Sequence, residues 1–194
     1  MKVVCWNIQG IKKRQAISEL KFLIKKHSPD LVFILETMVN TTNIQKIIPQ
    51  LGFDHYDFVP PLNHSGGIAV LWNNGAIHAS ILLKEQRAIY MLLHDTENSK
   101  TSIISGIYAP AQIRDNNPFW DRLIHMNTII DVPWCLMGDF NELASANDKL
   151  GGVIPHANGY SRLNQFLTTV NAEVLPVFGN MFTWKKRIHT HLVC

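Results

Sequence analysis

A carboxylate and an amide stand two residues apart where one apolar segment ends. Trp134–Gly138 is a predicted strand, and Asp139 and Asn141 follow it. Because side chains alternate along an extended chain, this spacing places both on one face. The pair suits phosphodiester hydrolysis, in which a carboxylate orients or deprotonates the attacking water and a neutral donor holds a phosphoryl oxygen. Taken alone, the pair is better explained as a strand end closed by an Asx turn, which Asp and Asn favour for local reasons.

Two other predicted strands also end in a polar side chain. Asn7 lies where the first strand, Val3–Ile8, stops, and Glu36 follows the second, Leu31–Leu35. In a sheet where these strands are neighbours, the two side chains would converge on one rim. Mg²⁺ is typically held by one or two carboxylates with waters and substrate phosphate, so one Glu with a nearby amide oxygen suffices. The local alternatives are a helix cap for Glu36 and a turn for Asn7.

The remaining segments must position these groups. The length of 194 residues and the lack of a linker or repeat between segments predict a single domain over residues 1–194. The predicted helices are Arg14–His27, Ile44–Leu51 (broken at Pro49), Pro118–Ile130 and Ser161–Val170. The other predicted strands are Tyr56–Val59, Gly67–Trp72, His78–Leu83, Ala88–His94 and Ser102–Tyr108, interpreted as a β-meander, and a last strand around Phe182–Lys185. Each sheet has one apolar face to bury, so this order favours an α+β sandwich of two facing sheets with helices outside.

Composition narrows the class of protein. Hydrophobic residues are 46% and charged residues 17% of the chain, which is typical of a packed protein rather than a disordered one. The net charge of +3 permits contact with a polyanion, although short basic runs such as these are more often solvated faces. The three cysteines are odd in number and widely spaced, which favours a reducing compartment. Without a signal-peptide core or a membrane-length apolar run, we expect an intracellular protein with no membrane partner.

Six short motifs occur in a fixed order: WNIQG, LET, SGGIAVLW, YAP, GDFN and FTW. In this order they resemble the endonuclease/exonuclease/phosphatase (deoxyribonuclease I-like) family. The likeness is greatest to the endonuclease domains of LINE-type retrotransposons of plants, which are relatives of apurinic endonucleases. The resemblance implies a four-layer α/β/β/α sandwich of two mixed sheets. It also implies a nuclear, Mg²⁺-dependent DNA endonuclease, with Mn²⁺ as an alternative ion, that leaves a 3′-hydroxyl and needs no small-molecule cofactor.

The resemblance also assigns roles to the strand-end residues. Glu36 would be the metal ligand, and Asn7 beside it would contact metal or phosphate. Tyr108 of the YAP motif would hydrogen-bond the scissile phosphate. Asp139 would position the nucleophilic water and Asn141 would stabilise the transition state. We expect all five to converge in one cleft, because one phosphate and one metal must touch them all.

The FTW motif supplies two further candidates. Phe182 and Trp184 match aromatic residues that lie near the DNA-binding pocket in the family. Core packing on a strand explains Trp184 equally well and explains Phe182 better.

The chain departs from the family pattern after FTW. The pattern continues with an Asp-bearing strand and a terminal Ser-Asp-His, whose His handles phosphate and proton, but this sequence stops at Cys194. His189 and His191 lie too soon after Trp184 to match that His. We therefore expect a sandwich without its last strands, an unpaired edge that promotes association, and no nicking activity. An inactive remnant is thus one alternative function; a phosphatase acting on inositol phosphates or phospholipids is another, although no basic headgroup pocket is evident.

Overall fold

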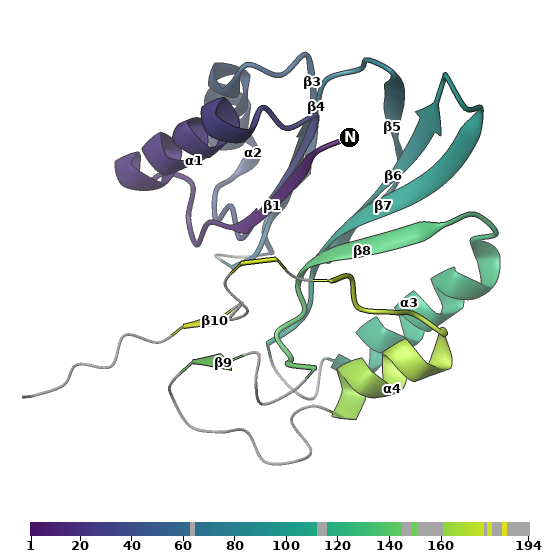
Figure 1. Ribbon diagram of the computed structural model, residues 1–194. Helices are drawn as coiled ribbons and strands as arrows, with labels where there is room; N and C mark the ends of the chain where they lie inside the picture. Colours follow the sequence, from purple (N-terminus) through teal and green to yellow (C-terminus); the bar gives the residue numbers. More distant parts are fainter. Residues whose placement is uncertain are drawn as a thin grey trace, which may run out of the picture. The chain divides into compact units, whose positions relative to one another are not determined.

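The first sheet is built around two strands that are apolar at every position. In the computed structural model, β2 (Leu31–Leu35) and β4 (Ile68–Trp72) pair antiparallel and are buried throughout. Such strands belong at the centre of a sheet that is covered on both faces. β1 (Val3–Asn7) joins β2 in parallel and β3 (His55–Val59) joins β4 antiparallel, giving the order β1-β2-β4-β3 (Figure 1).

Helices cover one face of this sheet. α1 (Arg14–His27) connects β1 to β2 and ends at Ser28, which has φ +45° and donates its N–H to the carbonyl of Ile24. α2 (Thr41–Ile47) begins at Asn40, whose side chain accepts from the Asn43 N–H, and runs into the 3-10 turn η1 (Ile48–Leu51). The apolar sides of these helices pack on β2 and β4 in one core that includes Leu20, Ile44, Ile48, Val32, Ile34 and Leu71.

The second sheet begins as an antiparallel meander and closes with a parallel strand. β5 (Ile77–Glu85), β6 (Ala88–Asp95) and β7 (Lys100–Tyr108) pair in sequence, and β8 (Trp134–Asp139) pairs parallel with β7. A second core joins the two sheets through residues that include Phe33, Leu35, Val70, Ile89, Met91 and Ile104. At Gly106 a Cβ would lie 2.3 Å from the Phe33 ring, so glycine is what lets β7 pass this close to β2.

The structure describes residues 1–62, 65–111, 116–144, 149–150, 161–176, 178–179 and 184–185. By its internal contacts the chain divides into two units. One comprises Met1–Pro110 with Ile130–Asp139, and it holds both four-stranded sheets; the other comprises Ala111–Ile129 with Phe140–Cys194. The expectation of a single domain over 1–194 stays a prediction.

The second unit has its own small core. It contains α3 (Asn116–Ile129), α4 (Ser161–Thr169) and two short parallel strands, β9 (Lys149–Leu150) and β10 (Trp184–Lys185). The buried ring of Trp120 lies 5.2 Å from that of Phe166 and 6.1 Å from that of Phe140. Over the ranges that the structure describes, no helix is long and apolar enough to cross a membrane.

The predicted elements are largely confirmed, with one error of assignment. The helix Arg14–His27 and the strand Leu31–Leu35 have the predicted bounds. The meander, however, does not extend through all five middle strands: β3 and β4 belong to the first sheet, and only β5, β6 and β7 form the meander. Alternation of apolar residues identifies a strand but does not specify its partner, which explains the error.

Candidate active site

The ends of β1 and β8 are joined by side chains. Asn7 Nδ2 donates a hydrogen bond of 2.7 Å to Asp139 Oδ2, across 132 residues of sequence. Asn7 ends a strand of the first sheet and Asp139 ends a strand of the second, so the contact bridges the sandwich at one rim. Both side chains are only partly buried. The amide thereby fixes the orientation of a carboxylate that solvent can still reach.

A second pair lies at the ends of β2 and β7. The hydroxyl of Tyr108 donates a hydrogen bond to the carboxylate of Glu36. Burial, this hydrogen bond and the negative charge of Glu36 together raise the pKa of Tyr108 to about 12, although the charge of Arg87 acts in the opposite direction. The phenol therefore keeps its proton at neutral pH and serves as a hydrogen-bond donor.

The backbone connects the two pairs into one group. Tyr108 is the strand partner of Asp139, and the Ala109 N–H donates to the Asp139 carbonyl at 2.8 Å. On the other sheet Asn7 is the strand partner of Leu35, and the residue after Leu35 is Glu36, whose carbonyl accepts from the Gly10 N–H at 2.9 Å. Strand register therefore sets the positions of all four side chains.

Glu36 has an unusual backbone conformation. Its φ of +53° lies in the left-handed region, which residues other than glycine seldom adopt. Hydrogen bonds hold the segment that follows Glu36, because the next two N–H groups, of Thr37 and Met38, donate to the carbonyls of Gly67 and Gly66. Strained conformations that the surrounding structure imposes are concentrated at functional sites.

The donor set at this rim fits a hard divalent cation. Glu36 and Asp139 offer carboxylate oxygens and Asn7 offers an amide oxygen, which are the ligand types that Mg²⁺ takes together with water. Across the described ranges, no three His, Cys, Asp or Glu side chains gather as they would at a zinc centre. Glu36, with Asn7 on the neighbouring strand, can thus contribute oxygens to such an ion.

The other predicted site residues have separate outcomes. Asn141 follows Asp139 by two residues, is exposed, has φ +49° and belongs to the second unit. The backbone of Trp184 lies in β10, paired with Lys149 of β9. Phe182 lies outside the described residues, as do His189, His191 and Cys194. The structure thus brings together Asn7, Glu36, Tyr108 and Asp139.

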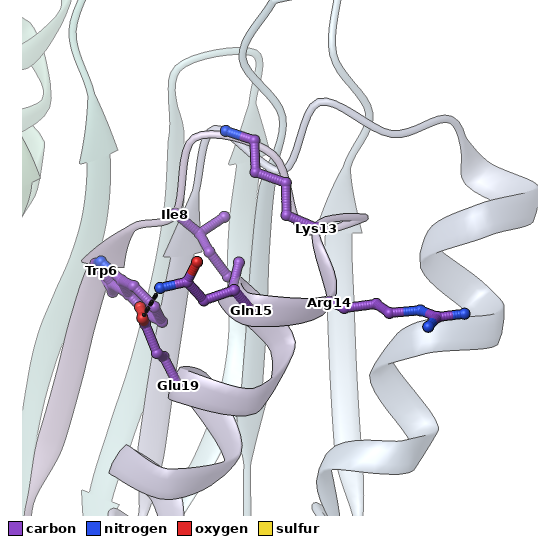
Figure 2. A pocket seen from close by; sticks show the side chains of 7 residues that line it. Trp6, Ile8, Lys13, Arg14, Gln15 and Glu19 are labelled. Carbon is purple, nitrogen blue, oxygen red and sulfur yellow. Dashed lines mark hydrogen bonds between the residues drawn. The ribbon is translucent and has the colours of Figure 1, made fainter.

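Two hollows are lined by residues that are close in sequence to Asn7 or Glu36. None of the four residues gathered at the rim lines either hollow. One, of about 420 Å³, is lined by residues that include Trp6 and Ile8, which flank Asn7, and by Lys13 and Glu19 of the α1 region (Figure 2). Glu19 accepts a 2.8 Å hydrogen bond from Gln15, while the Arg14 side chain extends away from Trp6 (Figure 2). The other, of about 340 Å³, is lined by residues that include Lys12, Met38 and Asn40.

Sequence reasoning did not identify Arg87. Its guanidinium carbon lies 5.2 Å from the centre of the Tyr108 ring, and its carbonyl accepts from the Tyr108 N–H at 3.0 Å. In the sequence Arg87 is one polar residue in a turn between two strands, and such residues are ordinarily solvent-facing. Only the pairing of β6 with β7 brings it to Tyr108.

Comparison with known proteins identifies a family. The model of the Endonuclease/Exonuclease/phosphatase family matches residues 4–185, which is nearly the whole chain. No curated protein matches the chain by sequence.

Solved structures share the fold. The AP endonuclease LMAP from Leishmania major has a TM-score of 0.68 and 16% identity, with 88% of this chain and 66% of that chain covered. The 3′ phosphatase NExo from Neisseria, bound to product DNA hairpin, has a TM-score of 0.64 and 12% identity, with 87% of this chain and 71% of that chain covered. The endonuclease domain of TRAS1, a telomere-specific non-LTR retrotransposon, has a TM-score of 0.60 and 12% identity, with 88% of this chain and 70% of that chain covered. The chain thus spans about two thirds of these proteins, and the predicted fold of two mixed sheets with helices is confirmed.

Proposed function

Because the chain belongs to the endonuclease/exonuclease/phosphatase family, we propose that it is a Mg²⁺-dependent endonuclease domain that nicks one strand of DNA. The observation that carries this proposal is the bridge between Asn7 and Asp139, beside the hydrogen bond between Tyr108 and Glu36. A carboxylate held in place, a proton-bearing phenol and a second carboxylate at one rim are the groups that phosphodiester hydrolysis requires.

Asp139 acts on the attacking water. The amide of Asn7 holds one carboxylate oxygen at 2.7 Å, so the group faces the substrate in one orientation. In that orientation the carboxylate accepts a proton of the water and directs its oxygen toward phosphorus. A positioned acid or base of this kind contributes about 10²- to 10⁴-fold in rate.

Tyr108 and Asn141 act on the phosphoryl oxygens. The phenol of Tyr108 keeps its proton, since its pKa is raised to about 12. When substrate binds, the single O–H of this phenol turns from Glu36 to donate a hydrogen bond to a non-bridging oxygen. Asn141 donates from its amide to the oxygen on which charge develops in the transition state. Each donor is neutral, so it stabilises the added negative charge without first forming an ion pair with a carboxylate.

The family is in general dependent on a divalent metal. Glu36 would hold the ion with Asn7 beside it, and their oxygens suit Mg²⁺ or, as an alternative, Mn²⁺. When bound, the ion supplies a Lewis acid for the phosphoryl and leaving oxygens. No small-molecule cofactor is needed for this chemistry.

The proposed substrate is DNA, and the proposed setting is a LINE-type retrotransposon of the plant kind, acting in the nucleus. The likeness in fold to the TRAS1 endonuclease domain and to an AP endonuclease supports this setting. The net charge of +3 is compatible with a polyanion. Trp184 and Phe182 are proposed to contact DNA near the cut, which leaves a 3′-hydroxyl.

Plasmid nicking tests the proposal. Supercoiled DNA is incubated with the 194-residue chain and Mg²⁺, and the open-circular product is compared with that from Asp139→Ala. Glu97→Gln is the matched control, because it removes an exposed carboxylate in the turn after β6, at the opposite end of that strand from Arg87 and the site. The pattern after FTW led to an expectation of no nicking, but the four residues gathered at the rim lead us to expect nicking that requires Mg²⁺, is abolished by Asp139→Ala and is retained by Glu97→Gln.

Two additional substrates separate the alternatives. A 3′-phosphorylated oligonucleotide and inositol phosphates are offered under the same conditions, with phosphate release as the readout. Phosphate release without plasmid nicking would assign the site to a phosphatase. Retained DNA binding without any hydrolysis would indicate an inactive remnant, and the proposed activity would be wrong.

A further inference from the structure

The turn between β5 and β6 brings an arginine to the candidate active site. The turn consists of Gln86 and Arg87, and it is anchored on both sides. Gln86 Nε2 donates to the Pro60 carbonyl at 3.0 Å, and the Tyr108 N–H donates to the Arg87 carbonyl at 3.0 Å. The side chain of Arg87 therefore begins beside the residue whose hydroxyl contacts Glu36.

The guanidinium of Arg87 has no acidic partner among the described residues. Its central carbon lies 5.2 Å from the centre of the Tyr108 ring, and the residue is half-buried. Two neutral groups donate to carboxylates of the site, because Tyr108 donates to Glu36 and Asn7 donates to Asp139. A guanidinium offers five N–H donors and is commonly paired with a carboxylate or a phosphate.

None of the four residues gathered at the rim carries a positive charge. Asn7, Glu36, Tyr108 and Asp139 comprise two carboxylates and two neutral groups, so none of them attracts a phosphodiester by its charge. Arg87 brings a permanent positive charge against the face of Tyr108. The planar guanidinium can donate to two oxygens of one phosphate at once, whereas the phenol of Tyr108 has a single O–H to donate.

We propose that Arg87 binds a phosphate of the DNA backbone at this site, an inference that rests on the proposed function. The stack on Tyr108 holds the guanidinium in place, so that it and the phenol donate to the same phosphodiester region. Arg87 is thus a substrate-binding residue of the site as well as a packing partner of Tyr108.

The dependence of DNA binding on salt tests this inference apart from catalysis. Binding of the 194-residue chain to a labelled duplex is measured by fluorescence anisotropy in EDTA, over about 50 to 200 mM salt. Arg87→Gln removes the charge. Arg87→Met removes the charge as well but keeps an apolar side chain over the Tyr108 ring, and Arg87→Lys keeps the charge. Lys84→Gln is the matched control, because it removes one charge from the same hairpin, where Lys84 pairs with Asp57 at 2.8 Å. Thermal denaturation identifies the variants that are folded.

Each neutralised phosphate contributes about −0.9 to the slope of log K against log salt. We expect Arg87→Gln and Arg87→Met to reduce the magnitude of that slope by about 0.9, and Arg87→Lys and Lys84→Gln to leave it unchanged. An unchanged slope in the two uncharged Arg87 variants overturns the inference, as does an equal fall in Lys84→Gln. If the wild-type chain nicks and binds DNA while those slopes do not move, only this inference fails. If the wild-type chain binds no DNA, the proposed function fails and the inference fails with it.

Discussion

Asn7 and Asp139 are hydrogen-bonded at 2.7 Å although 132 residues separate them in the chain. One ends a strand of the first sheet and the other ends a strand of the second. The amide donor and the carboxylate acceptor are complementary, so the bond stabilises the rim at which the two sheets meet. Because the same carboxylate is proposed to direct the attacking water, the first prediction concerns the residue that holds it.

Asn7→Asp should abolish most activity and lower thermal stability. The change replaces a donor with a second carboxylate at hydrogen-bond distance from Asp139, and two such groups cannot both be ionised without repulsion. We expect plasmid nicking at neutral pH to fall by about 10²-fold or more, with a smaller loss of Tm in Asn7→Ala than in Asn7→Asp. Nicking assays and thermal denaturation of both variants measure this. Wild-type activity in Asn7→Asp would contradict the assigned role of the pair.

Glu36→Gln should weaken Mg²⁺ binding more than Asp139→Asn does. Glu36 is proposed as a direct ligand, whereas Asp139 is proposed to act mainly on the water. Isothermal titration with Mg²⁺ measures binding without requiring activity, so both variants can be compared with the wild-type chain. Equal losses of affinity would disprove this division of roles.

Tyr108→Phe should reduce kcat while leaving the fold intact. The ring of Tyr108, which is 8% exposed and lies under the Arg87 guanidinium, remains in the variant, and only the hydroxyl is lost. Removal of one donor to a developing oxyanion typically costs about 10²- to 10³-fold in kcat. Steady-state kinetics and a thermal melt are the measurements. A drop in Tm large enough to account for the loss of activity would indicate a structural role instead.

Gly138→Ala should separate β7 from β8. Gly138 has φ +150°, and a Cβ built there would lie 1.9 Å from the carbonyl oxygen of Ile107, a backbone atom that cannot turn aside. Overpacking of this kind costs about 1–3 kcal/mol, and Asp139 follows directly, so activity should fall with stability. Gly75→Ala is the control, since its Cβ meets no atom within 4 Å. Chemical denaturation of the two variants decides the matter, and equal stabilities would refute the prediction.

Stability should fall as pH rises above 9. Burial, with a smaller effect of the Asp139 charge, raises the pKa of Cys5 from 9.0 to about 12, and the pKa of Tyr108 rises from 10.0 to about 12. The folded state therefore keeps two protons that the unfolded state releases between these values, and folding is progressively disfavoured over that range. Urea midpoints from pH 8 to 11 should decline less steeply in the double variant Cys5→Ala, Tyr108→Phe. An unchanged slope in the double variant would show that other groups are responsible.

The placement of polar residues at strand ends could be predicted from the sequence, because a strand that ends in a polar residue is visible locally. Asn7, Glu36 and Asp139 each follow an apolar run, and the structure brings them together with Tyr108. The sheet to which each middle strand belongs could not be predicted, since alternation carries no information about the partner strand.

Arg87 could not be predicted either. It lies in an ordinary polar turn, and its contact with Tyr108 exists only through the pairing of β6 with β7. The two-residue strand β9 was also missed, because so short a segment carries no periodicity.

The division of the site between two sheets has a consequence for how the chain acquires activity. β1 to β4 lie within Val3–Trp72, so a chain still emerging from the ribosome can complete the first sheet with Asn7 and Glu36 already at its rim. Tyr108 and Asp139 are synthesised later, and their contacts close some of the longest loops in the fold, which are slow to form. A partly made chain would therefore carry only half of the proposed site. The onset of DNA nicking would therefore measure when the two sheets pack together. Circular dichroism in the far ultraviolet, which measures secondary structure, would not detect that step.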